Sequence, residues 1–333
     1  MRMTALAVAA LATVAPAFAD QVNVYSYRQP ELIQPLFDVF TEKTGIKVNV
    51  AFLNKGMAER LKAEGARSPA DLAFTVDIGR LDALKSADVL DPLVTDSIKA
   101  NVPEQYRDPD GEWTALTTRA RIVYASRDRV ADGQVTTYED LADPKWKGRI
   151  CTRSGTHVYM LALTAGMIEQ HGVDYARDWL AGVKGNLARK PQGNDRAQVK
   201  AIWAGECDIS IGNTYYMALM MKNDEQKAWA DSVRIVFPTF ESGGTHVNVS
   251  GVALTKAAPN REAAIQLAEF LASQEGQRLY AEINSEYPVN PSVSALAVVE
   301  AFGQFNADDA NLQTIANFRD EALRITEEVD YDG

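Results

Sequence analysis

Cysteine and histidine are scarce in this sequence, with two and three copies among 333 residues. Two cysteines are too few for a thiolate metal site, and three scattered histidines offer few of the usual general bases. The chain also lacks the G-x-S-x-G and H-E-x-x-H motifs, and its glycine-rich segment Gly243–His246 lacks the strand–loop–helix context of a phosphate loop. These absences argue against an enzyme and favour a binding protein.

Basic residues are outnumbered, with 34 lysines and arginines against 45 acidic residues and a net charge of −11. A surface of this sign repels the phosphates of nucleic acid and disfavours wide contact with anionic lipid. The same field favours a cation, and it requires any anion site to be a local basic pocket. We therefore expect no nucleic-acid partner.

Long apolar runs are absent apart from Ala5–Val14, which is too short to span a bilayer. Arg2 precedes this run, and the small-residue ending Ala17–Ala19 follows it, a combination typical of a secretory signal peptide. We expect residues 1–19 to be cleaved, leaving a chain outside the cytoplasm without stable membrane insertion. Cleavage removes one basic and no acidic residue, so the mature charge becomes −12.

The two cysteines are Cys151 and Cys207, each just before a predicted strand. An oxidising compartment allows them to pair. If their strands are neighbours, the bridge closes a loop of about 55 residues, which the chain-entropy model values at about 4 kcal/mol. The alternative is two buried free thiols; we favour the disulfide.

Strand and helix patterns alternate along the mature chain, which predicts an α/β fold with mainly parallel sheets. Strands are expected at 22–27, 46–53, 71–75, 115–126, 149–152, 208–212 and 247–254, and helices at 30–44, 57–65, 78–86, 159–171, 174–183, 195–204, 261–273, 275–282 and 312–328.

Two of these strands, residues 115–126 and 247–254, have the character of segments that cross between two lobes. We expect the N-terminal lobe to contain 20–118 and 246–296, and the C-terminal lobe 119–245 and 297–333. Open α/β sheets bind ligands beyond the carboxyl ends of their strands, so the site should lie between the lobes. Lobes joined by two hinge strands can close on a ligand.

Gly212–Tyr216, with the sequence G-N-T-Y-Y, is the strongest local signal, because its two tyrosines follow the end of a predicted strand. Other tyrosines and arginines fall at comparable positions. They are Tyr27 and Arg28 after the first strand, Tyr159 at a helix start, Arg119 and Arg121 in a crossing strand, and Arg196 at another helix start.

Phenols beside arginines suit one kind of ligand. A hard, highly charged metal ion prefers anionic oxygen donors. A free phenol titrates near pH 10, but a bound cation can displace its proton. Three phenolates neutralise Fe³⁺, and arginine offsets the charge of an added anion.

The sequence resembles the periplasmic ferric-ion-binding proteins of bacterial iron ABC transporters over essentially the whole mature chain. The resemblance implies a type II periplasmic binding protein with transferrin-like lobes, which delivers iron to an inner-membrane ABC permease. The segments that carry it are 24–28 (VYSYR), 68–71 (SPAD), 119–124 (RARIVY), 144–150 (PKWKGRI), 208–216 (DISIGNTYY) and 286–291 (EYPVNP).

The resemblance further implies that Tyr215 and Tyr216 are iron ligands, with Tyr159 as the third. Some members of the family add a histidine and a glutamate from the first lobe. Here those positions are Gln29 and Val76, so other donors must replace them.

Two replacements are open. In one, Arg28 holds carbonate or another small anion, with help from the hydroxyl of Thr156 or Ser154. In the other, Tyr27 supplies a fourth phenolate. Arg119 and Arg196 are expected to act as surrounding charges or as plain surface salt bridges.

We therefore predict a monomeric solute-binding protein for Fe³⁺, with or without carbonate, rather than an enzyme. The alternative keeps the fold and changes the cargo to Fe²⁺, a small organic solute or an oxyanion.

Overall fold

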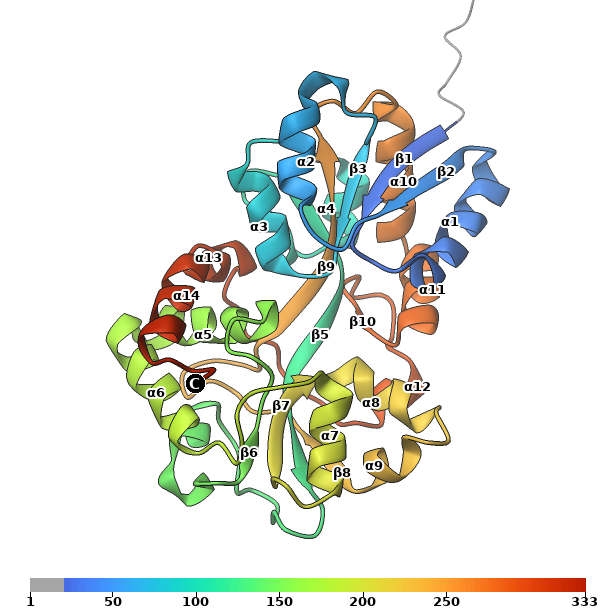
Figure 1. Cartoon of the computed structure of the whole chain (residues 1–333). Coiled ribbons are helices and arrows are strands. Elements are labelled where there is room, and N and C mark those ends of the chain that lie inside the picture. The colour runs from blue at the N-terminus through green and yellow to red at the C-terminus, as the bar shows by residue number, and fades with distance from the viewer. Residues whose placement is uncertain (1–20) are drawn as a thin grey trace, which may run out of the picture.

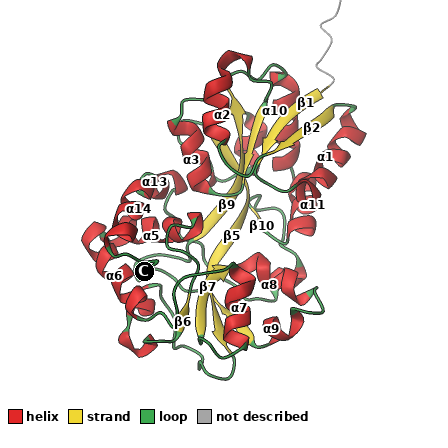
Figure 2. Ribbon diagram, viewed as in Figure 1, coloured by secondary structure: helices red, strands yellow, loops and turns green. Residues whose placement is uncertain are grey.

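The structure, a computed structural model, describes residues 21–333; the predicted signal peptide, residues 1–19, lies outside them. The chain forms two α/β lobes, one above the other in Figure 1, with strands passing between them. Figure 2 shows strands inside each lobe and helices around them. The two-lobed α/β prediction is confirmed. The expected mainly parallel sheets are instead mixed, because the strands at residues 113–126 and 247–255 run antiparallel to their neighbours.

The N-terminal lobe is built around parallel strands. β1 lies between β2 and β3 and runs parallel to both. The elements of this lobe are β1 (Gln21–Ser26), α1 (Pro30–Thr44), β2 (Lys47–Phe52), α2 (Met57–Glu64), β3 (Leu72–Thr75), α3 (Ile78–Ser86), β4 (Leu90–Asp91), α4 (Asp96–Asn101), α10 (Arg261–Ala272), α11 (Gln274–Asn284) and β10 (Tyr287–Pro288), with 3₁₀ helices at Gly65–Arg67 and Glu104–Tyr106.

The C-terminal lobe pairs β6 with β7 in parallel. Its elements are β6 (Ile150–Cys151), α5 (Val158–His171), α6 (Val173–Gly185), α7 (Asp195–Trp203), β7 (Ile209–Asn213), α8 (Thr214–Met221), α9 (Lys227–Asp231) and β8 (Val233–Val236), with 3₁₀ helices at Glu139–Ala142 and Pro144–Trp146. The chain ends with α12 (Ala297–Glu300), α13 (Leu312–Ala316) and α14 (Arg319–Glu328).

Two long antiparallel strands, β5 (Trp113–Ser126) and β9 (Val247–Thr255), cross between the lobes, and every residue in them is buried. β5 pairs with β9 from Trp113 to Ala120, then with β7 from Arg121 onward. The two crossing strands predicted from the sequence are therefore present. The change of partner falls two residues after the expected boundary at residues 118 and 119.

The expected single helix at 312–328 is wrong, because the chain breaks it into α13 and α14. Apolar residues keep a helical spacing through the break, so the pattern alone hides it. The two helices have different neighbours: α13 packs against α3 and α5, whereas α14 packs against α5 and α6. Gln313 accepts a hydrogen bond from Trp113 Nε1 (2.9 Å) and donates one to Asp82 (2.6 Å), so this segment touches both lobes.

The predicted disulfide is present and joins Cys151 of β6 to Cys207, just before β7. Both cysteines are buried, and their Cα atoms lie 5.9 Å apart. The bridge fastens two segments that are 56 residues apart in the sequence.

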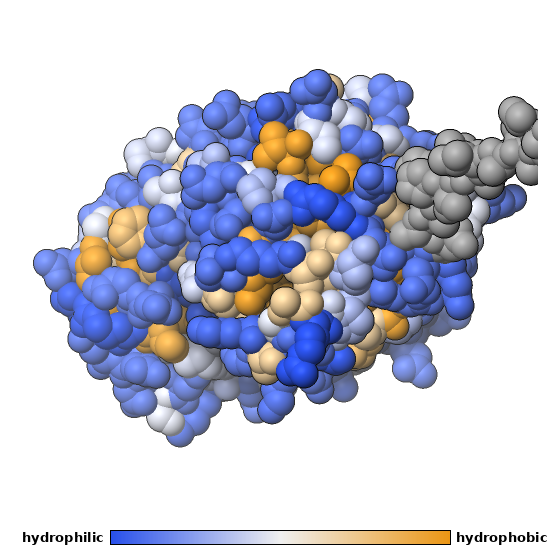
Figure 3. Space-filling view, turned by 90° about the horizontal axis from the view of Figure 1, so that it is seen from above, coloured by the Kyte–Doolittle hydropathy of each residue, from blue (hydrophilic) through white to orange (hydrophobic). Residues whose placement is uncertain are grey.

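The face seen from above in Figure 3 is mostly hydrophilic, with apolar residues in small, separate areas. Five large apolar side chains are prominently exposed within residues 21–333: Phe52, Val94, Tyr175, Trp203 and Met221. Over the same residues, every helix is too short or too polar to cross a bilayer.

Candidate metal-binding site between the lobes

The adjacent tyrosines lie where the sequence predicts them, at a strand-to-helix turn. β7 ends at Asn213, and Tyr215 and Tyr216 occupy the first turn of α8. Their ring centres are 4.3 Å apart, and the guanidinium carbon of Arg196 lies 5.7 Å from the centre of the Tyr216 ring. The start of a helix carries partial positive charge, which favours anionic oxygens nearby.

Tyr159 is the second residue of α5 and is 3% exposed. Its ring centre is 4.0 Å from the guanidinium carbon of Arg121 and 5.4 Å from that of Arg153. Its hydroxyl donates a long hydrogen bond, 3.4 Å, to the carbonyl of Ile211 in β7. Two cations next to one phenol favour its ionised form.

A buried carboxylate organises this cationic group. Asp195 is fully buried and accepts hydrogen bonds from Arg153 (2.9 Å) and from the backbone N–H of Asn213 (3.2 Å). The Asn213 side chain in turn accepts one from Arg121. Sequence reasoning treated Asp195 only as the start of a helix. The available signal was the position of Asp195 directly after Asn194, the residue that caps the helix.

The three phenols share one electrostatic environment. Burial is the main reason that the pKa of Tyr159, Tyr215 and Tyr216 is raised above the ordinary value, and Asp195 raises it further. Nearby arginines oppose this rise, although the net direction stays upward. All three phenols are therefore neutral at pH 7 in the absence of a cation.

Arg28 lies in a buried network at the hinge. Its guanidinium donates to Glu286 (2.8 Å), to Ser250 of β9 (2.5 Å) and to Asn284 (3.3 Å). Arg119 of β5 also donates to Ser250 (2.9 Å). Tyr215 lies close enough that its phenolate, once formed, would stabilise the charge of Arg28.

Tyr27 lies on the N-terminal lobe, directly after β1. Its hydroxyl accepts a hydrogen bond from the backbone N–H of Met57 (2.8 Å), and the guanidinium carbon of Arg80 lies 4.3 Å from its ring centre. Arg80 also acts on His157 of the C-terminal lobe, whose pKa is lowered to about 3, chiefly by burial and then by Arg153 and other arginines. Arg80 thus links Tyr27 electrostatically to the opposite lobe.

Thr156 is exposed in the turn before α5. Its hydroxyl lies 2.8 Å from that of Ser154, which donates to the Asp332 carboxylate (2.5 Å). The backbone N–H of Gly155 donates to the same carboxylate (2.8 Å). The C-terminal end of the chain therefore already holds part of the turn in which an anion was expected.

The chain is similar to known extracellular solute-binding proteins. Residues 67–303 match the family described as bacterial extracellular solute-binding protein. The chain is 42% identical to iron uptake protein A2 of Synechocystis, over 98% of this chain and 94% of that protein. The chain belongs to the ferric-binding group of the bacterial extracellular solute-binding proteins.

Solved structures of this family share the fold. Ferric iron-binding protein A of Mannheimia haemolytica, in an open conformation, superimposes with a TM-score of 0.90 at 46% identity, covering 95% of this chain and all of that one. Trichodesmium FutA in complex with iron and citrate gives a TM-score of 0.90 at 40% identity, covering 93% of this chain and 99% of the other. Proteins of this solute-binding family serve transport and are not enzymes.

Proposed function

We propose that this protein binds Fe³⁺ between its lobes through the phenolates of Tyr159, Tyr215 and Tyr216. The observation that carries the proposal is the gathering of three phenols from α5 and α8, one buried and two half-buried, beside several arginines. The iron-binding names of the relatives support the same cargo.

The charge balance supports a trivalent ion. Three phenolates neutralise Fe³⁺, and a hard cation prefers such oxygen donors. The buried Asp195 already compensates part of the surrounding arginine charge through its contact with Arg153. The remaining positive charge, on Arg121 and Arg196, stabilises the phenolates once the ion has displaced their protons.

We further propose that carbonate completes the coordination, held by Arg28 and by Thr156. Arg28 already forms a salt bridge with Glu286, so an anion that binds Arg28 has to share its guanidinium with that carboxylate. In bicarbonate buffer, Arg28→Ala should weaken ferric binding, and in carbonate-free buffer the variant and the parent should become similar. An equal loss in both buffers would assign Arg28 a structural role only.

The fourth donor can instead be Tyr27, which lies on the opposite lobe. Closure of the N-terminal lobe (20–118 and 246–296) onto the C-terminal lobe (119–245 and 297–333) would bring Tyr27 toward the other tyrosines. Tyr27→Phe should then shift the ferric charge-transfer band while leaving binding saturable. An unchanged band excludes Tyr27 as a ligand.

Transport follows from the family and the predicted export signal. We propose that residues 1–19 are removed on export, that the mature chain acts as a monomer in the periplasm, and that it delivers iron to an inner-membrane ABC permease. Compaction on iron binding, measured by solution scattering, tests the lobe closure that such delivery requires.

A titration with ferric citrate at neutral pH tests the ligand set. Phenolate bound to Fe³⁺ gives a visible charge-transfer colour that ferric citrate lacks, and we expect it to saturate at one iron per chain. Changing Tyr215 and Tyr216 together to Phe should abolish it, whereas Tyr106→Phe, which removes a phenol from the 3₁₀ helix Glu104–Tyr106 of the N-terminal lobe, should not. A colourless wild-type protein would contradict the ferric site and favour Fe²⁺ or an organic solute as the cargo.

A further inference from the structure

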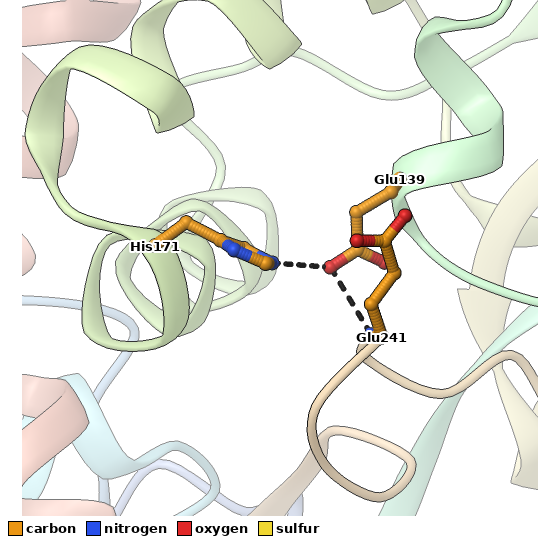
Figure 4. A group of neighbouring side chains, drawn as sticks. All are labelled: Glu139, His171 and Glu241. Atoms are coloured by element: carbon orange, nitrogen blue, oxygen red, sulfur yellow. Dashed lines mark hydrogen bonds and ion pairs between the residues drawn. The ribbon is translucent and has the colours of Figure 1, made fainter.

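A second group of metal-ligating side chains lies within the C-terminal lobe, well away from the tyrosines. Glu139, His171 and Glu241 each offer one ligand atom, and these three atoms all lie within 4.8 Å of one another. Figure 4 shows the three side chains converging from three separate segments. His171 ends α5, whose first turn carries Tyr159, so about 18 Å of helix separates the two groups.

The buried member of the group has an unused oxygen. Glu139 is 8% exposed, and its Oε1 lies 2.6 Å from Nε2 of His171 and accepts a 3.3 Å hydrogen bond from the backbone N–H of Glu241. Its Oε2 is buried without a hydrogen-bond partner among the described residues. A buried carboxylate oxygen left in this way is costly, and a cation would satisfy it.

The net charge of Glu139, His171 and Glu241 also favours a bound cation. With a neutral imidazole, the two carboxylates contribute a net charge of −2. Within residues 21–333, neither Glu139 nor Glu241 forms a salt bridge with a lysine or an arginine. One divalent ion would neutralise the group, and the negative net charge of the chain favours its approach.

Contacts independent of any ion hold the three segments together. The backbone N–H of Tyr138 donates to the carbonyl of Thr239 (3.0 Å), which places the segments of Glu139 and Glu241 side by side. Ser242 donates to Gln170 (2.8 Å), which fastens the Glu241 segment to the end of α5. The His171 ring stacks on Tyr175, with ring centres 4.3 Å apart.

We propose that Glu139, His171 and Glu241 form a second metal site, which takes one divalent first-row transition ion such as Zn²⁺. One imidazole nitrogen and two carboxylate oxygens are donors that such ions accept. The ion would bind between Nε2 of His171 and the carboxylate of Glu139, whose unpartnered Oε2 it would satisfy, and the imidazole proton would move from Nε2 to Nδ1. Donors that lie 2.0–2.2 Å from a tetrahedral zinc ion are about 3.3–3.6 Å from one another. The pair formed by His171 and Glu139, now 2.6 Å apart, would therefore open, and a donor 4.8 Å away would move in by about 1 Å.

The site would brace one lobe rather than carry cargo, because all three ligands belong to the C-terminal lobe. Glu241 lies in the segment that leads from β8 into the crossing strand β9. An ion at this point would fix that segment to α5 and to the 3₁₀ helix Glu139–Ala142. Its occupancy would then raise the stability of the lobe without requiring lobe closure.

Zinc chloride titration of the full mature chain tests the proposal, with calorimetry and thermal unfolding as readouts. The tyrosine site is removed from the comparison by repeating the titration on the Tyr215→Phe/Tyr216→Phe variant. We expect one Zn²⁺ per chain in both proteins, with a rise in melting temperature. Glu241→Gln, at an exposed position, should weaken Zn²⁺ binding at least tenfold, and the exposed control Glu225→Gln should not.

The outcomes separate this site from the ferric site. Zn²⁺ binding that survives Glu241→Gln but is lost with the tyrosines would place the ion at the ferric site and overturn the proposal. Absence of Zn²⁺ binding in the wild type would leave Glu139 and His171 as a plain hydrogen-bonded pair. Conversely, Glu241→Gln should retain the ferric charge-transfer colour in full, so a failure of either site is visible without the other.

Discussion

The guanidinium carbon of Arg121 lies 4.0 Å from the centre of the Tyr159 ring. Arg121 is the first residue of β5 to pair with β7 rather than β9, so the cation lies where the strand passes from one lobe to the other. The phenol and the shared strand are therefore parts of one structural unit.

Removal of this cation should weaken ferric binding. In Arg121→Gln the Tyr159 phenolate loses its nearest positive charge, and we expect the ferric dissociation constant, measured by competition with citrate, to rise at least tenfold. Arg196→Gln provides the comparison, because Arg196 lies farther from its tyrosine at 5.7 Å and should have a smaller effect. Equal effects of the two substitutions would contradict a specific role for Arg121.

Iron uptake should release protons. The pKa of Tyr159, Tyr215 and Tyr216 is raised by burial, so each phenol holds its proton at pH 7 until iron displaces it. Ferric affinity should therefore fall as the pH is lowered. Calorimetry in buffers of different ionisation enthalpy should count about three protons per iron, and release of none would rule out phenolate ligands.

Loss of the disulfide should destabilise the C-terminal lobe. The bond between Cys151 and Cys207 spans 56 residues, and the chain-entropy model assigns such a loop about 4 kcal/mol. We expect the free energy of unfolding in urea to fall by about that amount in the Cys151→Ser/Cys207→Ser variant. A change below about 1 kcal/mol would mean that the constraint is already provided by β6 and β7.

Acid should destabilise the protein through His246. Burial, and then Arg121, lowers the pKa of this histidine to about 3 in the folded state, whereas an unfolded histidine has a pKa near 6.5. The unfolded chain binds the proton more readily, so the stability present above pH 6.5 is lost as the pH falls toward 3, by about 1.4 kcal/mol for each pH unit. The free energy of unfolding in urea, measured between pH 7 and 4, should depend less steeply on pH in His246→Gln than in the wild type.

Neutralising Glu286 should cost far more than neutralising a surface glutamate. Its carboxylate is 1% exposed, and its pKa is held low, against the effect of burial, by Arg28 and Arg119. Glu286→Gln leaves both arginines without that charge, and we expect a loss of about 3–5 kcal/mol in urea unfolding. The matched control is Glu282→Gln in α11, an exposed partner of Arg278, which should change stability by less than about 1 kcal/mol.

Local patterns were sufficient for much of the fold. In α1, Ile33, Leu36, Phe37 and Phe40 are buried on one face, as their spacing predicts, and Gly45 ends the helix with a positive φ. The tyrosines could also be placed from the sequence, because the strand pattern before them predicts where each strand ends. The ends of neighbouring strands meet at one edge of a sheet.

Partners distant in sequence could not be predicted from such patterns. Arg28 was proposed as an anion ligand, yet its buried partner Glu286 is 258 residues away, and nothing near either residue marks the pair. Asp195 was missed because a carboxylate at a helix start has an ordinary local explanation. The break between α13 and α14 was missed because apolar residues keep a helical spacing through it, although α13 packs on α3 and α14 on α6 in addition to their shared neighbour α5.

The place of β9 in the sheet also bears on when the protein can fold. β9 lies between β3 and β5, yet it is made of residues 247–255, so the N-terminal lobe lacks an interior strand until about three quarters of the chain has been synthesised. A lobe without that strand exposes the unpaired backbone of β3 and β5 and cannot complete its core. The N-terminal lobe can therefore complete its sheet only after the segment between β5 and β9, which carries β6, β7 and β8, has been made.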